Sequence, residues 1–348
     1  MHRRLIFIVI VIYVFIAGCK DDPFDVDISD IDVDIEIKRL DHDLFAYDPE
    51  EVCNHVPDMA TKYGDFFEVY NYSIIKLGGY NTKAYCTYLQ DFVSDFMISE
   101  INEECSKVFE DIGDIEGLLN DAFRHYKYYY PEREVPEVIS YISGFNQSVV
   151  TSGNYLGISL DKYLGSSCRF YPQLGIPKYM RYRMHRGMVV ADCMTAVAQR
   201  DYEFMPDDTL AGAGNAADAP QDNLLNNMIY RGRIMYFVKA MLPDHPDSLI
   251  FGFTGKQLQW CGRNEKNMWM YLIEKKMLFT TEYMDIKRYI DEAPFTTTFT
   301  KESPGRSGVW IGWRIVCSYM KNNPDVTLQQ LMEDTDYQKI LQKSKYNP

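Results

Sequence analysis

Hydrophobic and polar positions alternate strictly near the start of this chain. Four apolar residues are separated by charged ones: Ile31, Val33, Ile35 and Ile37 alternate with Asp32, Asp34, Glu36 and Lys38. Because successive side chains of a strand point to opposite faces, this pattern predicts a half-buried β-strand over 31–38. The residues before it, 19–30, are acidic and poor in large apolar groups, which predicts a solvated tether.

Between residues 58 and 130 the apolar spacing changes to that of helices. Large apolar residues recur every three or four positions, for example Phe66, Tyr70 and Ile74, and then Tyr85, Leu89, Phe92 and Phe96. This spacing puts them on one face of a helix and predicts several helices, the last of which ends before Pro131.

Short runs of β-favouring residues follow between 135 and 164. The runs are 138–142, 148–150 and 155–160, and they are separated by Gly144 and Gly153. Three short runs with turn signals between them predict three strands in a meander.

From Pro177 onward the pattern is helical to the C-terminus. The clearest stretches are 186–204, 222–242, 255–279, 307–322 and 326–343, with a Gly-, Ala-, Asn- and Asp-rich loop predicted at 207–221. We therefore expect an α+β fold, mostly helical with a small β-meander sheet. Nothing in the composition divides 31–348, so we expect a single domain there.

The first nineteen residues have the order of a secretory signal. Arg3 and Arg4 precede an apolar run of about thirteen residues, shorter than the ~20 of a membrane-spanning helix, and small residues precede Cys19. This site resembles the lipobox of bacterial lipoproteins, which implies acylation of Cys19 (palmitate) and removal of 1–18. The alternative is an uncleaved N-terminal anchor. Both tie the exported chain to a membrane.

Lys20-Asp21-Asp22 resembles the export signal of surface lipoproteins in Bacteroidota. A short charged run is also typical of any solvated tether. We expect the outer membrane in preference to the inner one, and the sequence leaves open whether the protein faces the periplasm or the cell surface.

The charge of the chain restricts its partners. The net charge is −14, and about −16 once Arg3 and Arg4 are removed. A protein this acidic repels nucleic acid and anionic lipid, so we expect no nucleic-acid partner, and the N-terminal lipid provides the contact with the membrane.

Motifs for a metal, cofactor or catalytic nucleophile are missing from the sequence. No two of the six histidines are four apart, as H-E-x-x-H requires, and no C-x-x-C pair occurs among the eight cysteines. The sequence also has no phosphate-binding loop and no G-x-S-x-G elbow. We expect no metal, no cofactor and no catalysis. Cys86, Cys193 and Cys317 lie in apolar-periodic stretches and are predicted to be buried thiols, although one disulfide is left open.

Two clusters suggest a ligand or partner surface. One closes the last predicted strand at Asp161, and the other, 303–314, opens a C-terminal helix. Arg306 is poorly placed for the helix dipole, so we expect an internal carboxylate to hold it. The candidate residues are Asp161, Arg306, Trp310, Trp313 and Arg314. The alternative is a tightly packed helix, because Gly305, Gly308 and Gly312 permit close approach of backbones.

These clusters also carry a family resemblance. The chain resembles the gliding-motility-associated lipoprotein GldB family of Bacteroidota through the following segments. They are "DIEIKRLDHDLF" (34–45), "LDKYLG" (160–165), "YPQLGIPKYM" (171–180), "NMIYRGRIMYFVKAMLP" (227–243), "QLQWCGRNEKNMWMYLI" (257–273), "SPGRSGVWIGWRIVCSYM" (303–320) and "SKYNP" (344–348). The resemblance implies an envelope-anchored accessory lipoprotein with no assigned catalytic site. We expect it to act by binding envelope proteins.

A second resemblance concerns the fold alone. The order of a small sheet, a helix at 186–204 and a helix carrying Arg231 is similar to that of gluzincin peptidases, which implies a lost metal site because no histidine lies in 189–201. Two other functions remain open. One is a degenerate or atypical metallopeptidase-like hydrolase, and the other is binding of a glycan or small ligand by Trp260, Trp269, Trp310 or Trp313.

Overall fold

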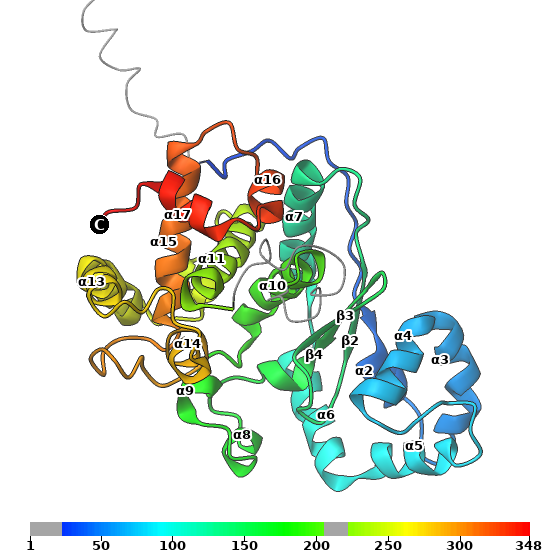
Figure 1. Cartoon of the computed structure of the whole chain (residues 1–348). Coiled ribbons are helices and arrows are strands. Elements are labelled where there is room, and N and C mark those ends of the chain that lie inside the picture. The colour runs from blue at the N-terminus through cyan, green and yellow to red at the C-terminus, as the bar shows by residue number, and fades with distance from the viewer. Residues whose placement is uncertain (1–22, 205–221) are drawn as a thin grey trace, which may run out of the picture.

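The computed structural model describes residues 23–204 and 222–348. The signal sequence, Cys19 and the loop expected at 207–221 lie outside these residues. The fold is α+β as predicted, with many helices around a four-stranded mixed sheet (Figure 1). No helix in the two described ranges is long and apolar enough to cross a membrane.

The elements before and within the sheet are as follows. They are β1 (Lys38–Arg39), α2 (Leu40–Leu44), η1 (Val52–His55), α3 (Val56–Tyr63), α4 (Asp65–Val69), η2 (Tyr70–Ile74), α5 (Tyr85–Ser94), α6 (Phe96–Val108), α7 (Gly113–Tyr129), β2 (Glu137–Tyr141), β3 (Val149–Ser152) and β4 (Tyr155–Ser159).

The elements after the sheet are all helical. They are η3 (Leu160–Tyr163), α8 (Phe170–Gln173), α9 (Lys178–Arg181), η4 (Arg186–Met188), α10 (Val189–Asp201), α11 (Leu224–Met241), α12 (Asp247–Phe251), α13 (Gly255–Glu274), α14 (Tyr283–Ile290), α15 (Ser307–Asn322), α16 (Leu328–Glu333) and α17 (Tyr337–Ser344).

The sheet corrects the predicted meander. The strand order is β1-β2-β4-β3, with β4 parallel to β2 and antiparallel to β3. Gly153 and Asn154 close a tight β3–β4 hairpin, so that pair was predicted correctly. The β2–β3 connection over 142–148 is longer, and it turns where Gly144 and Phe145 both have positive φ. This wide turn carries the chain past one strand position, which β4 then fills.

The strand predicted over 31–38 is wrong for all but its last residue, whereas its buried and exposed faces are predicted correctly. Only its last residue lies in a strand, β1, and residues 31–37, here called the strap, run beside α7 (blue in Figure 1). The Ile35 N–H donates to Asn120 Oδ1 at 2.7 Å, and the Ile37 N–H donates to Glu116 Oε1 at 2.9 Å. Val33, Ile35 and Ile37 are buried while the acidic residues between them are exposed. Side chains of α7 thus replace a neighbouring strand.

One residue of the predicted tether is packed against the body of the protein. Phe24 is buried, and its ring lies 4.9 Å from that of Tyr236 on α11. A single aromatic residue in an acidic segment gives too weak a periodic signal to predict this contact.

The sheet separates two hydrophobic clusters. In β2, Val138 packs into a large cluster built mostly from α7, α10, α11 and the C-terminal helices, while Ile139 and Tyr141 pack into a smaller cluster. The smaller cluster is built from α2 to α5 and the segments between them. Because neighbouring strand residues point to opposite faces, one short strand contributes to both clusters.

Helices α11 and α15 make the most extensive contact in the large cluster (Figure 1). A Cβ added at Gly312 would overlap the backbone of Met228, and one added at Gly232 would overlap the backbone of Gly312. Glycines on both helices therefore let the two backbones touch, which confirms that Gly312 is a site of close approach.

Other sequence predictions are confirmed in part. The helix at 307–322 has the bounds predicted, but 326–343 is split into α16 and α17, because Thr327 caps the first and Asp336 the second. Cys193 is buried as expected and Cys317 is partly buried, whereas Cys86 is exposed on α5, contrary to the prediction. The apolar periodicity around Cys86 belongs to its neighbours Tyr85 and Leu89, which face the small cluster.

Candidate functional site

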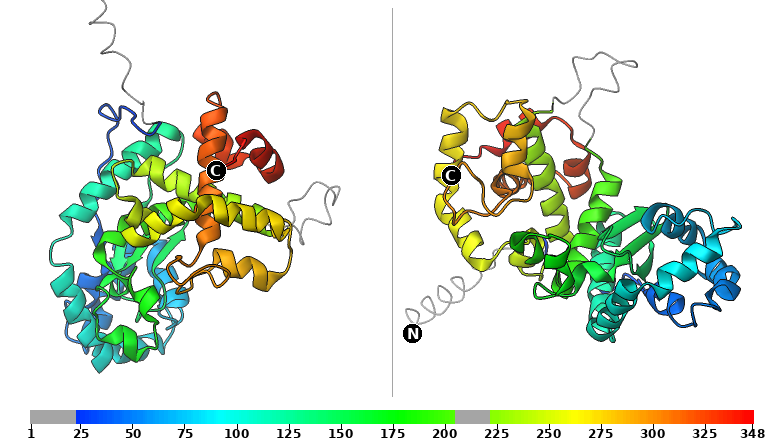
Figure 2. Two further views of the ribbon diagram at one scale, coloured as in Figure 1. Left: turned by 90° about the vertical axis from the view of Figure 1, so that its left-hand side faces the viewer. Right: turned by 90° about the horizontal axis from the view of Figure 1, so that it is seen from below.

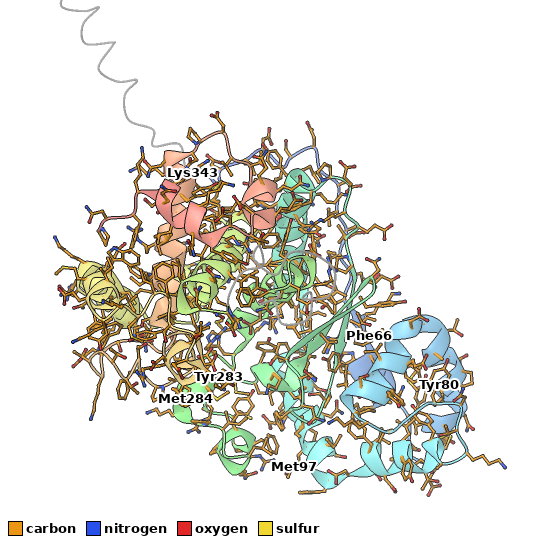
Figure 3. The ribbon with its side chains drawn as sticks, in the orientation of Figure 1. Phe66, Tyr80, Met97, Tyr283, Met284 and Lys343 are labelled. Carbon is orange, nitrogen blue, oxygen red and sulfur yellow. The ribbon has the colours of Figure 1, made fainter. Side chains whose placement is uncertain are left out.

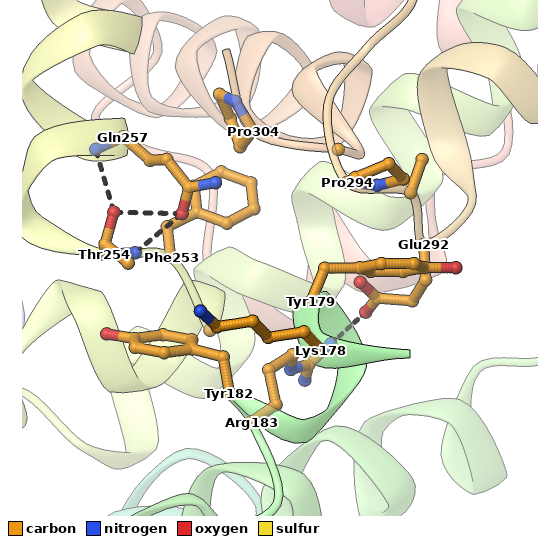
Figure 4. Close-up of a pocket in the computed structure, with 13 residues that line it drawn as sticks. Lys178, Tyr179, Tyr182, Arg183, Phe253, Thr254, Gln257, Glu292, Pro294 and Pro304 are labelled. Carbon is orange, nitrogen blue, oxygen red and sulfur yellow. Dashed lines mark hydrogen bonds and ion pairs between the residues drawn. The ribbon is translucent and has the colours of Figure 1, made fainter. Parts of the chain in front are cut away.

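A pocket of about 430 Å³ lies between three segments that are far apart in the sequence. Residues 178–179 and 182–183, on α9 and just after it, form one wall. Residues 252–254 and 257 at the start of α13 form the second, and 292–294 with 304–305 before α15 form the third (Figure 4). Its size is that of a small-ligand site or of a cleft for a few residues of a partner.

Local sequence signals fix two of the three walls. Pro177, in an extended conformation, precedes α9, and proline commonly stands at a helix start. Gly252 ends α12 in the left-handed region, with φ +62°, and a Cβ there would overlap the Arg183 side chain. Thr254 and Gln257 form a capping box at the start of α13, so the second wall is held rigidly.

A network of half-buried and exposed charges lines the pocket and extends below it. Arg183 is paired with Glu292 and, at 3.1 Å, with Asp192. The Nε of Arg306 lies 3.0 Å from the same Glu292 carboxylate, and its Nη2 donates to the Phe251 carbonyl at 2.5 Å. Tyr163 donates its hydroxyl to Asp192 at 3.0 Å. Arg306 is therefore held by an internal carboxylate, as the sequence analysis expected.

The two arginines differ in how well they are compensated. Burial lowers the pKa of Arg306 to about 10, and repulsion from Arg183 adds to the effect. Burial also opposes the charge of Arg183, but Asp192 and Glu292 outweigh it and raise its pKa. The shared Glu292 carboxylate thus stabilises the charge of Arg183 more than that of Arg306. The unfavourable burial of the Arg306 charge is compensated only in part.

The predicted surface residues do not form one site. Arg306 follows Pro304 and Gly305 of the pocket wall, but Trp310, Trp313 and Arg314 lie further along α15. The ring of Trp313 packs 5.0 Å from that of Phe251, and the Nε of Arg314 donates to Glu265 at 2.8 Å. These contacts fit the alternative of a tightly packed helix.

Asp161 lies elsewhere and is completely buried after β4. It accepts the N–H groups of Phe145 at 2.6 Å and Ser143 at 3.3 Å, and the hydroxyl of Ser159. Burial raises its pKa, and these donors counteract the shift only in part. Asp161 therefore holds the wide turn after β2 and is not part of a surface.

The tryptophans do not line the pocket. Trp260 packs against Phe299, Trp269 against Tyr346, and Trp310 against Trp313. Rings already packed against aromatic neighbours give little support to the prediction that they stack on a glycan.

Sequence reasoning missed Lys178, Tyr182, Arg183 and Glu292. A signal for the first three was present, because residues 162–191 contain no aspartate or glutamate in a strongly acidic chain. Glu292 had no such signal, since only the folded chain brings it to Arg183.

The fold and this pocket define a mostly helical α+β protein whose site is built from charges and aromatic residues. In the described ranges, no group of three or more His, Cys, Asp or Glu side chains is placed to hold a metal ion. The chain belongs to the family described as gliding motility protein GldB, whose model matches residues 21–348. As a member of this lipoprotein family, it is a membrane-anchored protein of the cell envelope.

The comparisons with curated proteins and with solved structures found no match. The expected similarity to gluzincins therefore stays a prediction. Helix α10, where such a peptidase would carry its histidines, has none.

Proposed function

We propose that this lipoprotein acts without catalysis, by binding another envelope protein through the surface around the pocket. The observation that carries the proposal is a cluster of exposed apolar side chains, with one exposed and one half-buried cation among them, in α8, α9 and the residues next to them. We call this cluster the α9 face, and its members are Leu174, Lys178, Met180, Arg181 and Tyr182.

The composition of the α9 face is typical of protein interfaces. Leu174, Met180 and Tyr182 are each 40% exposed or more, although each is a residue that a protein tends to bury. Tyrosine, methionine and arginine are enriched at interfaces, and grouped apolar residues on a surface commonly mark a binding site.

The position of the face also supports the proposal. The described chain starts near the top of Figure 1, while α8 and α9 lie at the opposite end of the molecule, and the left view of Figure 2 agrees. A tether at the first end would leave the α9 face pointing away from the membrane. Figure 3 shows Met97, 47% exposed at the start of α6, at the same lower end.

Site-specific cross-linking in intact cells tests the proposal. A photoreactive phenylalanine analogue at Tyr182 should give a discrete cross-linked protein, and the same analogue at Tyr128 should not. Tyr128 is a matched control because it is 47% exposed on α7, against 41% for Tyr182. Equal cross-linking at both positions, or none at Tyr182, would contradict the proposal.

Lipid anchoring is tested separately. Cys19→Ala should abolish incorporation of labelled palmitate and move the protein from the membrane fraction to the soluble fraction, because the acyl chains provide the anchor. Retention of the variant in membranes would show that the N-terminal segment is an uncleaved anchor.

The pocket volume alone would also suit a small ligand. The exposed apolar residues outside the pocket favour a protein, because a small ligand would leave Leu174 and Met180 uncovered.

A further inference from the structure

The segment around α9 has the opposite charge from the rest of the protein. Residues 162–191 contain six basic residues and no acidic one, while the whole chain has a net charge of −14. The basic residues are Lys162, Arg169, Lys178, Arg181, Arg183 and Arg186. Such a local reversal of charge sets the sign of the partner that the segment attracts.

Four of these six cations are engaged within the fold. Lys162 donates to the Phe145 carbonyl at 3.3 Å, and Arg169 pairs with Glu100 at 2.7 Å. Arg183 pairs with Asp192 and Glu292, and Arg186 pairs with Asp114.

Lys178 and Arg181 have no acidic partner among the described residues. They stand three positions apart on α9 and so share one side of it. Lys178 is exposed and lines the pocket. Arg181 is half-buried beside the pocket lining, and its Nε is buried without a hydrogen-bond partner. Lys178 is therefore available to a ligand, and Arg181 adds positive charge next to it.

The opposite wall of the pocket adds further positive potential. Helix α13 is twenty residues long, has no acidic residue in its first turn, and begins at this wall. The positive end of its dipole therefore faces the same space as Lys178, whose side chain extends toward Thr254 in Figure 4.

The charge network at the pocket contains more arginines than the carboxylates that interact with them most strongly. Arg183, Arg231 and Arg306 interact there with Asp192 and with Glu292, which itself lines the pocket. A carboxylate arriving in the pocket would reduce the repulsion among these arginines.

We propose that the pocket and the α9 face bind an acidic segment of a partner protein. One carboxylate of that segment lies between Lys178 and the start of α13, and apolar side chains beside it cover Leu174, Met180 and Tyr182. This assignment rests on the proposed function and specifies the chemistry of its partner. A membrane is not the occupant, because an anionic membrane repels the acidic chain as a whole and the tether places the membrane at the other end.

A binding assay with the full mature protein in detergent tests the assignment. The probe is a fluorescein-labelled hexapeptide in which glutamate alternates with leucine or tyrosine, and fluorescence anisotropy measures its dissociation constant. A second peptide with glutamine in place of glutamate serves as the neutral control. The test variant carries Lys178→Glu and Arg181→Glu. A control variant carries Lys321→Glu and Lys343→Glu, which makes the same change in net charge at exposed positions; Lys343 lies at the top of Figure 3, far from α9.

We expect the glutamate peptide to bind the wild-type protein more tightly than the glutamine peptide, and more weakly as salt is raised. The test variant should bind it about tenfold less tightly or worse, and the control variant should bind it as the wild type does. The assignment is overturned if the two peptides bind alike, if both variants lose the same affinity, or if phosphatidylglycerol vesicles bind the face and the peptide does not. Cross-linking at Tyr182 with no peptide binding would overturn the acidic partner alone, whereas no cross-linking would contradict the proposed function itself.

Discussion

The two sides of the sheet handle buried polar groups in different ways. On the side of the small cluster, tyrosines are buried, and two of their hydroxyls donate to neutral groups of the fold. Tyr70 donates to the Ile142 carbonyl at 2.9 Å, and Tyr85 donates to Asn71 Oδ1 at 2.7 Å. On the side of the large cluster, Arg233 is buried, and Arg183 and Arg306 are half-buried at the pocket. The small side keeps the buried Asp41 next to Arg39 within the fold, while the large side places arginines at a pocket that a partner can reach.

Two arginines on the large-cluster side of the sheet, Arg233 and Arg306, differ in the groups that hold them. Arg233, 2% exposed, donates to the carbonyls of Leu331 and Met332 at 3.1 and 3.0 Å and to the Tyr337 hydroxyl at 3.0 Å. These carbonyls lie near the end of α16, where they lack helical donors, so Arg233 caps a helix. Arg306 instead shares Glu292 with Arg183. A buried arginine alone is therefore no sign of a site, whereas one with a shared carboxylate next to a pocket is a candidate.

Gly312→Leu should have the largest effect, because it attacks the contact between α11 and α15. The new side chain would overlap the backbone of Met228, which cannot move without separating the two helices. We expect a loss of more than about 5 kcal/mol and no folded protein, measured by circular dichroism and thermal unfolding. Gly262→Ala on α13 is the control, because a Cβ there meets nothing; it should raise stability by roughly 0.5–1 kcal/mol. A folded Gly312→Leu protein would mean that the helices do not touch.

Phe66→Ala should have the second-largest effect, because it lowers the stability of the small-cluster side of the sheet. Phe66 is fully buried on α4 beside the sheet (Figure 3), and its ring packs against those of Tyr141 and Tyr155. Removing it should cost about 3–5 kcal/mol, because the cavity left behind cannot collapse onto a sheet. Chemical denaturation measures the loss, and Tyr182 cross-linking of the remaining folded protein should be unchanged. Loss of that cross-linking would show that the two sides are coupled.

Trp313→Ala should cost less, about 2 kcal/mol, because Trp313 is only partly buried against Phe251. This figure is below what full burial would predict. Thermal unfolding distinguishes a packing residue from a binding residue. An unchanged midpoint with lost cross-linking at Tyr182 would assign Trp313 to the partner surface.

Asp161→Asn should have the smallest effect, about 1 kcal/mol, and it should depend on pH. Because burial raises the pKa of Asp161 in the folded state, this carboxyl favours folding most at pH below its ordinary value of 3.8. Its contribution is lost as the pH rises from 3.8 through the raised pKa. The stability of the variant relative to wild type should therefore increase with pH across this window, as urea unfolding at several pH values would measure. A difference that stays constant with pH would contradict the raised pKa.

Sequence patterns predicted the helices and buried faces better than the partners of each element. The alternation at 31–37 correctly separated buried from exposed residues, yet alternation is the same whether the backbone bonds to a strand or to Asn120 and Glu116. The strand order was missed for a related reason, because hydrophobic pattern specifies which face a strand buries and leaves its neighbour open. Only the charge of the pocket could be predicted, since the residues that form it come from three segments spread over more than a hundred positions.

The strap has a mechanical consequence for a protein held by a lipid. A pull on the tether enters the fold at Phe24, passes along residues 31–37, and reaches β1. The bonds to Asn120 and Glu116 join this path to α7, and the parallel pairing of β1 with β2 runs along the same direction. Tension is therefore shared between a helix and the sheet and loads the β1–β2 hydrogen bonds in shear, so that they must break together. When force acts on the lipid anchor, it therefore reaches the body of the protein while residues 31–37 are still bound to α7.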